Sequence, residues 1–213
     1  SGTNLTWYSD ASLTTVVGNG VSLSTNQTSS GLYTYYVTST DVNGCESSAI
    51  SVLLEIYAIP TAPTAVNQTA CFGTTIPDLT ASGTNLTWYS DASLTTVVGF
   101  GASFATNQTV AGVYTYYVTE TNAYSCESGA TVVTLTINAF TTLPVSTNQT
   151  ACFGATIPDL TATGVGTSFT WYSDVSLNIV VGNGSPFSTG QTASGVYTYY
   201  VTESQNGCES PAA

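Results

Sequence analysis

The sequence predicts an all-β protein made of tandem antiparallel β-sandwiches, and three observations carry this prediction. First, a Gly-[Leu/Val]-Tyr-Thr-Tyr-Tyr-Val-Thr motif occurs three times, at residues 31–38, 112–119 and 195–202. Second, its side chains follow the two-residue period of a strand, so that Tyr33 and Tyr35 point to one face and Tyr36 to the other. Third, turn residues recur about every 8 to 12 residues, and no helical periodicity is seen.

The start of this motif predicts the kind of sandwich. A glycine followed two residues later by a tyrosine is typical of the strand that carries the tyrosine corner in immunoglobulin-like domains. One such strand in each copy indicates three immunoglobulin-like repeats in tandem.

The repeat boundaries follow from aligning the copies. Ser1–Gly18 is identical to Ser82–Gly99. We therefore divide the chain into repeat 1 (1–58), repeat 2 (59–139) and repeat 3 (140–213). Two extra residues precede Trp171, near 164–166, and predict a turn there. Repeat 1 lacks a first strand and repeat 3 a last strand, as expected of a window within a longer array. The alternative is a filament whose subunits complete one another's sheets by strand addition.

Repeat 2 is complete, and its elements can be predicted in order. A linker with Pro60 and Pro63 suits a stiff connector or an edge strand. Leu86 and Trp88 share one face of a later strand and Tyr89 takes the other, so that Trp88 is expected to be buried. The expected strands cover residues 67–73, 85–91, 95–99, 102–109, 112–119 and 131–137.

The charge inventory excludes several classes of function. The chain has six Asp and six Glu but no Lys, Arg or His, for a net charge of -12. Without cations it cannot neutralise phosphates, so nucleic acid and anionic membrane surfaces are poor partners. Catalysis by His or Lys is impossible, and repeated copies of one small sandwich offer no asymmetric cleft for paired carboxylates. We expect no enzyme and no catalytic residue. No apolar run reaches the roughly 20 residues that span a bilayer, so we expect no direct membrane insertion.

The five cysteines predict one disulfide in each repeat. Cys71 and Cys126 lie in repeat 2, Cys152 and Cys208 lie in repeat 3, and Cys45 corresponds to Cys126. Pairing within repeats leaves Cys45 with a partner outside the window. Such bridges imply an oxidising, extracellular setting. The spacing matches no metal or redox motif.

Four segments together resemble a known group of repeats. They are "ACFGTTIPDLTA", "LTWYSDASLTTVVG", "GVYTYYVTE" and "CES". The combination is similar to bacterial immunoglobulin-like repeats of very large Bacteroidota surface proteins, including gliding-motility-associated and type IX-secreted adhesins. The resemblance covers essentially the whole chain. It implies secretion, surface attachment and fibre-like extension, and it brings no catalytic residues.

Six tyrosines at equivalent positions of the repeats are candidates for a contact surface. They are expected to face outward on neighbouring strands, where they suit lateral packing in a fibre or, alternatively, the stacking of sugar rings. The six are Tyr8, Tyr36, Tyr89, Tyr117, Tyr172 and Tyr200.

Acidic residues also recur at equivalent positions. Calcium could bridge them at repeat junctions, but no calcium-loop spacing is present, and turn-forming and solvating roles fit better. We therefore expect no cofactor and no metal site. The positions are Asp10, Asp91, Asp174, Asp78, Asp159, Glu46, Glu127 and Glu209.

These observations together predict a non-catalytic repeat segment of an extracellular filament or cell-surface adhesin stalk. Its expected partners are other copies of the chain or other repeats in the fibre, together with surface glycans. The alternative is a carbohydrate-binding module array that uses the exposed tyrosines.

Overall fold

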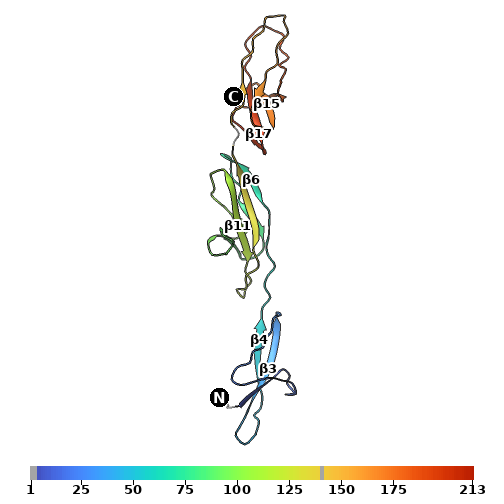
Figure 1. Ribbon diagram of the computed structural model, residues 1–213, viewed down its shortest axis with the longest axis vertical. Coiled ribbons are helices and arrows are strands. Elements are labelled where there is room, and N and C mark those ends of the chain that lie inside the picture. The colour runs from blue at the N-terminus through green and yellow to red at the C-terminus, as the bar shows by residue number, and fades with distance from the viewer. Residues whose placement is uncertain (1–3, 140–141) are drawn as a thin grey trace. The chain divides into compact units, whose positions relative to one another are not determined.

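A computed structural model describes residues 4–139 and 142–213, and all regular structure in these residues is β (Figure 1). Chain contacts define two compact units, Ser1–Ala62 with Thr119–Gly129, and Pro63–Val118 with Ala130–Ala213. The strands of repeat 1 are β1 (Asn4–Tyr8), β2 (Val16–Asn19), β3 (Gly31–Thr40) and β4 (Ile50–Ile56). Those of repeat 2 are β5 (Thr64–Ala65), β6 (Gln68–Cys71), β7 (Leu79–Ser82), β8 (Leu86–Tyr89), β9 (Val97–Phe100), β10 (Ser103–Phe104), β11 (Gly112–Glu120) and β12 (Thr131–Asn138). Those of repeat 3 are β13 (Val145–Ser146), β14 (Ala162–Thr163), β15 (Ser168–Tyr172), β16 (Val180–Asn183), β17 (Tyr200–Gln205) and β18 (Cys208–Glu209).

Repeat 2 is a two-layer sandwich, which confirms the predicted fold class. One sheet has the order β6-β12-β11-β8-β9, and the other has the order β10-β7-β5. β12 is antiparallel to β11, β8 is antiparallel to β9, and β7 is antiparallel to both β10 and β5. β6 instead runs parallel to β12, with Leu135 opposite Gln68 and Asn138 opposite Cys71. Along each strand, side chains that point inward alternate with side chains that meet water. The inward side chains form one core.

The centre of this core is an aromatic group. Trp88 is fully buried, as predicted, and stacks on Phe104 with ring centroids 5.5 Å apart. Phe104 in turn meets the edge of Tyr116 at 5.2 Å. Phe104 also lies against Gly99, where an added Cβ would come within 2.6 Å of its ring. The small residue in β9 therefore makes room for the ring.

The tyrosine corner is present in all three repeats. The hydroxyls of Tyr33, Tyr114 and Tyr197 each donate to the backbone carbonyl four residues earlier, at 3.0, 2.9 and 3.3 Å. The bond fixes the chain where it turns into the long tyrosine strand, which confirms the role predicted for the motif.

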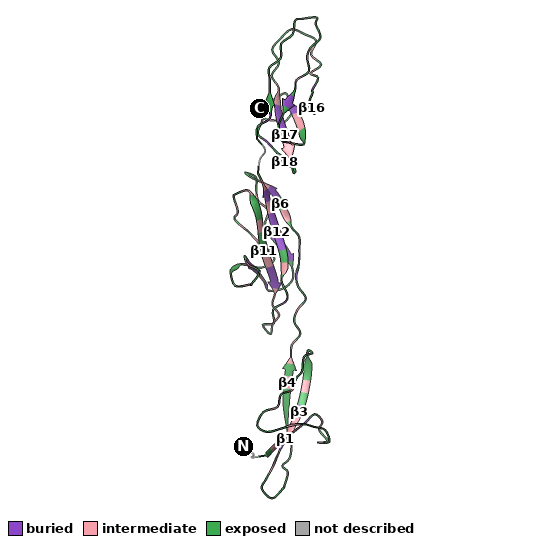
Figure 2. Ribbon diagram, in the orientation of Figure 1, coloured by how far each residue is buried: buried purple, intermediate pink, exposed green. Residues whose placement is uncertain are grey.

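Repeat 1 keeps one sheet of this design, with the order β2-β1-β3-β4. Its described residues, from Asn4 onward, include no counterpart of β5, β6 or β7. Trp7 is consequently only half-buried, and β4 is an edge strand (Figure 2).

Repeat 3 has a four-stranded sheet, β16-β15-β17-β18, and the short pair β13-β14. Trp171, Phe187 and Val201 form its core with Ala162. The two inserted residues lie in the loop between β14 and β15, as predicted. In that loop the Gly166 amide donates to Oε2 of Glu203 at 3.0 Å, so the insertion covers a fully buried carboxylate.

Candidate functional site: the repeat junction

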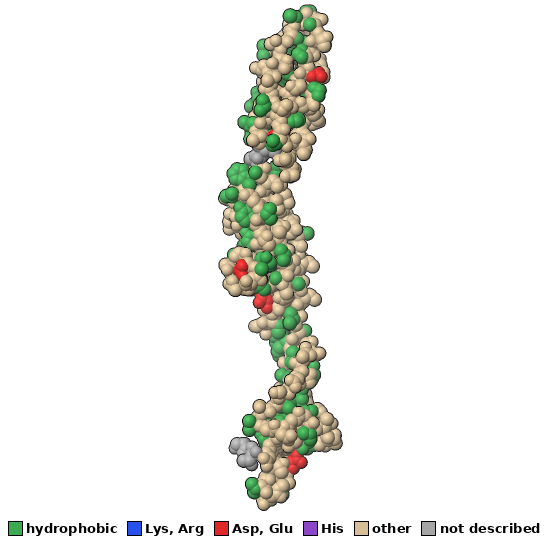
Figure 3. Space-filling view, viewed as in Figure 1, with side chains coloured by type: hydrophobic (Ala, Val, Ile, Leu, Met, Phe, Trp, Pro, Cys, Tyr) green, Lys and Arg blue, Asp and Glu red, His purple; other side chains and the backbone are tan. Residues whose placement is uncertain are grey.

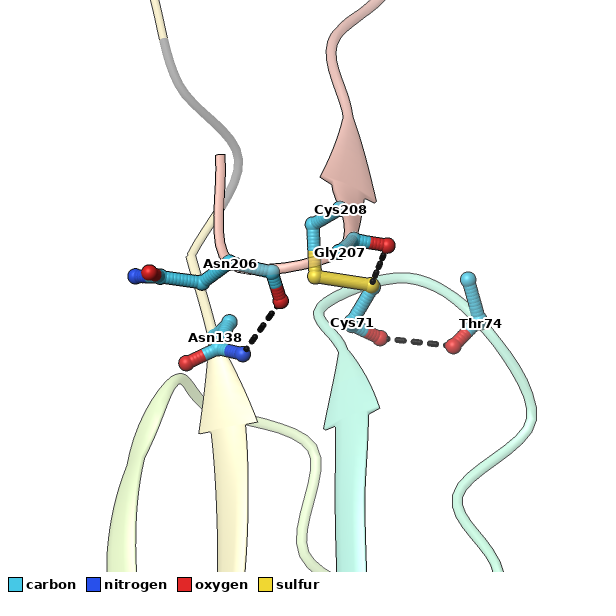
Figure 4. The surroundings of a disulfide bond; sticks show 6 residues. All are labelled: Cys71, Thr74, Asn138, Asn206, Gly207 and Cys208. Atoms are coloured by element: carbon cyan, nitrogen blue, oxygen red, sulfur yellow. Dashed lines mark hydrogen bonds between the residues drawn. A yellow bond between two sulfur atoms is a disulfide. The ribbon is translucent and has the colours of Figure 1, made fainter. Parts of the chain in front are cut away.

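A disulfide joins repeat 2 to repeat 3. It links Cys71, the last residue of β6, to Cys208, the first residue of β18, with Cα atoms 5.5 Å apart. Figure 4 shows Cys71 and Asn138 at neighbouring strand ends, both facing the turn that precedes Cys208. The bond therefore ties the end of one sandwich to the first residue after a hairpin turn of the next.

The predicted pairing of one disulfide within each repeat was wrong. Cys71 lies opposite Asn138, the last residue of β12, because β6 is parallel to β12. Cys126 instead comes before Thr131, the first residue of β12. A strand of this length separates the two positions by roughly 23 Å at 3.3 Å per residue, far beyond the reach of a disulfide. An antiparallel first strand would have brought them together, and the spacing in sequence does not distinguish the two directions.

The hairpin turn of repeat 3 fits this junction. Asn206 and Gly207 both have positive φ, at 51° and 78°, as a two-residue hairpin turn of this kind requires. Asn138 Nδ2 donates to the Asn206 carbonyl at 3.2 Å, and the Cys71 sulfur lies 3.7 Å from the Gly207 carbonyl oxygen. The exposed backbone of the turn is thus held against the ends of two strands of repeat 2.

The equivalent hairpin turn of repeat 2 meets the end of repeat 1 in the same way. Tyr57 follows β4 at the position of Asn138, and its ring stacks on Tyr124 with centroids 3.6 Å apart and planes 8° apart. Asn122 Nδ2 donates to the Ala58 carbonyl at 2.9 Å. Cys126, in the same hairpin, is a free thiol of intermediate exposure. The junction therefore recurs, with a Tyr–Tyr pair in one place and an Asn–Asn pair in the other.

Two further cysteines are free. Cys45 and Cys152 are both exposed thiols. Sequence reasoning identified all five cysteines as structural, but it assigned their partners within repeats and missed the residues that adjoin them in the junctions. A signal for these contacts is present in the sequence. Tyr57 and Tyr124 lie at one junction, and the equivalent positions at the next junction are Asn138 and Asn206.

The comparison with protein families gives a match along nearly the whole chain. The model described as "Ig-like domain CHU_C associated" matches residues 1–56, 60–138 and 141–213. The chain belongs to this family. It comprises three tandem CHU_C-associated Ig-like domains, a type typical of Bacteroidota surface proteins. The comparison with curated proteins finds no match.

The six tyrosines do not form the exposed strip that was expected in these Ig-like domains. Tyr8, Tyr89 and Tyr172 are buried, and their counterparts Tyr36, Tyr117 and Tyr200 are partly buried. Tyr8 lies opposite Tyr36, and Tyr172 lies opposite Tyr200. Tyr8 and Tyr172 are covered by the glutamate after the junction cysteine of their own repeat, Glu46 and Glu209, whose side chains accept hydrogen bonds from the two phenols. The surface considered for lateral packing or, alternatively, for sugar stacking is therefore largely covered.

These glutamates form a recurring hydrogen-bonded cluster. Glu46 Oε1 accepts from the Tyr8 hydroxyl at 2.7 Å and from the Thr38 hydroxyl, and Glu209 likewise accepts from Tyr172 at 2.6 Å and from Thr202. The Thr38 and Tyr8 hydrogen bonds lower the pKa of Glu46, because they favour the carboxylate. The bond to Glu46, helped by desolvation, raises the pKa of Tyr8, since the phenol proton is held between them.

The aspartates that follow the tryptophan strands form turns. Asp10 accepts from the Thr14 amide at 3.1 Å and the Thr15 amide at 2.7 Å, and Asp91 binds Thr95 and Thr96 in the same way. These backbone hydrogen bonds lower the pKa of both carboxyl groups. Asp174 accepts from Asn178 and Ile179, and Asp78 accepts from Ser103. Turn formation accounts for the recurrence of Asp10, Asp91 and Asp174, whereas Asp78 bonds a residue 25 positions away.

The remaining surface of the Ig-like domains offers little ionic chemistry. Acidic side chains are scattered over the face drawn in Figure 3, and the sequence supplies no cation. Among the described residues no group of three or more His, Cys, Asp or Glu side chains is placed to hold a metal. Within residues 4–139 and 142–213 no helix is long and apolar enough to cross a membrane.

Proposed function

We propose that this chain is a non-catalytic structural segment of an extracellular filament or cell-surface adhesin stalk. The observation that carries the proposal is the Cys71–Cys208 disulfide, because it cross-links neighbouring repeats where a stalk must transmit tension. Disulfides form in oxidising compartments, which fits a secreted protein. The family supports a surface location, and the resemblance to gliding-motility-associated and type IX-secreted adhesins supports the stalk. The partners are other repeats of the same fibre.

The disulfide has a defined mechanical consequence. Cys71 and Cys208 are 137 residues apart in sequence. When the two ends of the chain are pulled, the bond carries the force directly from Cys71 to Cys208. The residues between them are then unable to extend, even if their strands unfold. A stalk built in this way lengthens little under load.

Single-molecule stretching of the whole chain tests this role. Complete unfolding of the oxidised chain is expected to release a contour length about 450–490 Å shorter than that of the reduced chain, since each extended residue spans about 3.3–3.6 Å. Cys71→Ser should behave like the reduced chain under oxidising conditions, and Cys152→Ser is the matched control that should leave the difference in place. Equal contour lengths before and after reduction would remove the load-bearing role.

The surface location is tested separately. Antibodies raised against the chain are expected to label intact cells of the source organism, and chymotrypsin added to intact cells should remove the label. Trypsin is the matched control, since the chain contains no Lys or Arg. Labelling that appears only after lysis would contradict an extracellular stalk.

A further inference from the structure

Two tyrosines stack on each other where the end of repeat 1 meets the hairpin of repeat 2. Tyr57 follows β4, and Tyr124 lies in the turn between β11 and β12. Both residues belong to one compact unit of the chain. Their ring centroids are 3.6 Å apart and their planes differ by 8°. Aromatic pairs more often lie offset or edge to face, with centroids about 4.5–7 Å apart. The ring carbons of these two tyrosines are therefore unusually close to each other.

The junction of repeats 2 and 3 has asparagines at the same two positions. Asn138 takes the place of Tyr57 and Asn206 that of Tyr124, and Asn138 Nδ2 donates to the Asn206 carbonyl at 3.2 Å. Asn206 is exposed although the strands and the disulfide around it are in place. The 59% exposure of Tyr124 is thus typical of this turn position. One junction carries an accessible pair of phenols where the other carries amides.

A carboxylate is bonded to one of the two phenols. The Tyr57 hydroxyl donates to Oε2 of Glu55 at 2.7 Å. This hydrogen bond is the main cause of the raised pKa of Tyr57, so the phenol keeps its proton at neutral pH. A protonated phenol gives up an electron readily only if the proton leaves as well, and Glu55 is placed to accept that proton. Tyr124 can release its proton to water, because the residue is exposed.

We propose that Tyr57 and Tyr124 form an oxidative modification site, at which the two rings become joined as dityrosine. Each phenol loses one electron and one proton, which gives two adjacent tyrosyl radicals. A carbon–carbon bond forms between ring carbons next to the two hydroxyl groups. Each of these carbons then loses its hydrogen as a proton while the phenol oxygen gains one, which restores both aromatic rings. The oxidant is hydrogen peroxide acting through a peroxidase, and it takes up the two electrons and two protons to become two molecules of water.

The new bond joins repeat 1 to the hairpin of repeat 2, as the disulfide joins repeat 2 to repeat 3. It uses no cysteine, so a reducing agent that opens the Cys71–Cys208 bond leaves it intact. The chemistry of the pair is independent of the stalk role, whereas its mechanical value rests on that proposed function.

The test treats the whole chain, in dilute solution, with a peroxidase and hydrogen peroxide and then reduces the disulfide. Cleavage after aspartate and glutamate places Tyr57 in the peptide of residues 56–78 and Tyr124 in the peptide of residues 121–127. Mass spectrometry should find these two peptides joined, with a mass two hydrogen atoms below their sum. Tyr124→Phe should abolish the product. Tyr197→Phe is the matched control, since Tyr197 is 44% exposed but lies outside the pair, and it should leave the yield unchanged.

A second variant tests the proton acceptor. In Glu55→Gln the amide oxygen can still accept the Tyr57 hydrogen bond, but it is a far weaker base than the carboxylate. The joined peptides should therefore form more slowly, and between the same two residues. An unchanged rate would remove Glu55 from the reaction.

Two results would overturn the site itself. One is a set of joined peptides in which those containing Tyr197 are as abundant as the expected product, since exposure alone would then explain the coupling. The other is an undiminished yield of the joined peptides 56–78 and 121–127 in Tyr124→Phe. Because the product is detected by mass after reduction, neither result depends on the disulfide or on a load along the chain.

Discussion

Repeats 1 and 2 share an identical stretch of sequence but bury it differently. Residues 1–18 and 82–99 are the same, yet Trp7 is half-buried and Trp88 is completely buried. The indole N–H of Trp7 donates to the Gly20 carbonyl, and that of Trp88 donates to the Gly101 carbonyl, both at 2.9 Å. The local strand and turn are therefore set by local sequence. In repeat 2 the core is completed by β7, a strand of the second sheet, which supplies Leu79 and Ala81.

Removing the tryptophan should produce the largest difference between the two repeats. Trp88→Ala is expected to destabilise repeat 2 by about 3–5 kcal/mol, because it leaves a cavity in a closed core. Trp7→Ala should cost repeat 1 clearly less, since the Trp7 side chain already meets water. Denaturant-dependent hydrogen exchange of the whole chain measures both, with the β3 and β11 peptides distinguishing the repeats by mass. Equal costs for Trp7→Ala and Trp88→Ala would show that the second sheet contributes little to burial of the tryptophan.

A glycine beside the aromatic core gives the next largest effect. Gly99→Ala would place a Cβ 2.6 Å from the Phe104 ring, and overpacking of this kind costs about 1–3 kcal/mol. Gly18→Ala is the matched variant in repeat 1, where the nearest atom is a methyl group of Leu23 at 2.7 Å. A leucine end can rotate away, so the Gly18 variant should lose less stability. Loss of stability in repeat 1 equal to that in repeat 2 would contradict this account.

The tyrosine corner should give a smaller and more equal effect. Tyr114→Phe removes a 2.9 Å hydrogen bond to the Val110 carbonyl and is expected to cost about 0.5–1.5 kcal/mol. Tyr33→Phe removes the equivalent bond to Ser29. Both bonds are local and independent of the second sheet, so hydrogen exchange should report similar losses in the two repeats. A loss confined to repeat 2 would mean that the corner depends on the closed core.

The same distinction between local and distant determinants explains what the sequence could predict. The tyrosine strand, the buried Trp88 and the inserted turn were predicted, because alternation and turn residues act over a few positions. The direction of β6 was not, because pairing parallel or antiparallel to β12 leaves the same alternating pattern. That single uncertainty changed the disulfide partner of Cys71.

The tyrosine surface was mispredicted for a related reason. Alternation places Tyr8 on the outer face of its sheet, where exposure is the ordinary expectation. The glutamate at position 46 returns to this face from a separate hairpin and accepts the Tyr8 hydroxyl. A residue that covers a strand from a distant part of the sequence leaves no periodic pattern in that strand. The only sign in the sequence is that a glutamate follows each hairpin cysteine.

The smallest expected effect is a pH response present in one hairpin and absent in the other. Asp41 Oδ1 accepts from the amides of Asn43 and Cys45, at 2.9 and 2.8 Å. Asn122 makes the same two bonds to Tyr124 and Cys126, both at 3.0 Å. The hydrogen bond from Cys45, and next that from Asn43, lower the pKa of Asp41 below its ordinary value of 3.8. The asparagine has no proton to gain, so protonation of this turn residue should weaken only the hairpin of repeat 1.

The sign of the effect follows from the lowered pKa. The Asp41 carboxylate stabilises its turn fully above about pH 4, where the unfolded chain is also ionised, and this contribution is lost as the pH falls through the lower pKa of the folded state. NMR should show the Cys45 amide signal moving further than the Cys126 amide signal as the pH falls below about 4. Asp41→Asn should remove this difference between the two signals. A Cys126 signal that shifts in parallel would instead indicate a common acid transition of both repeats, with Asp41 having no separate part in it.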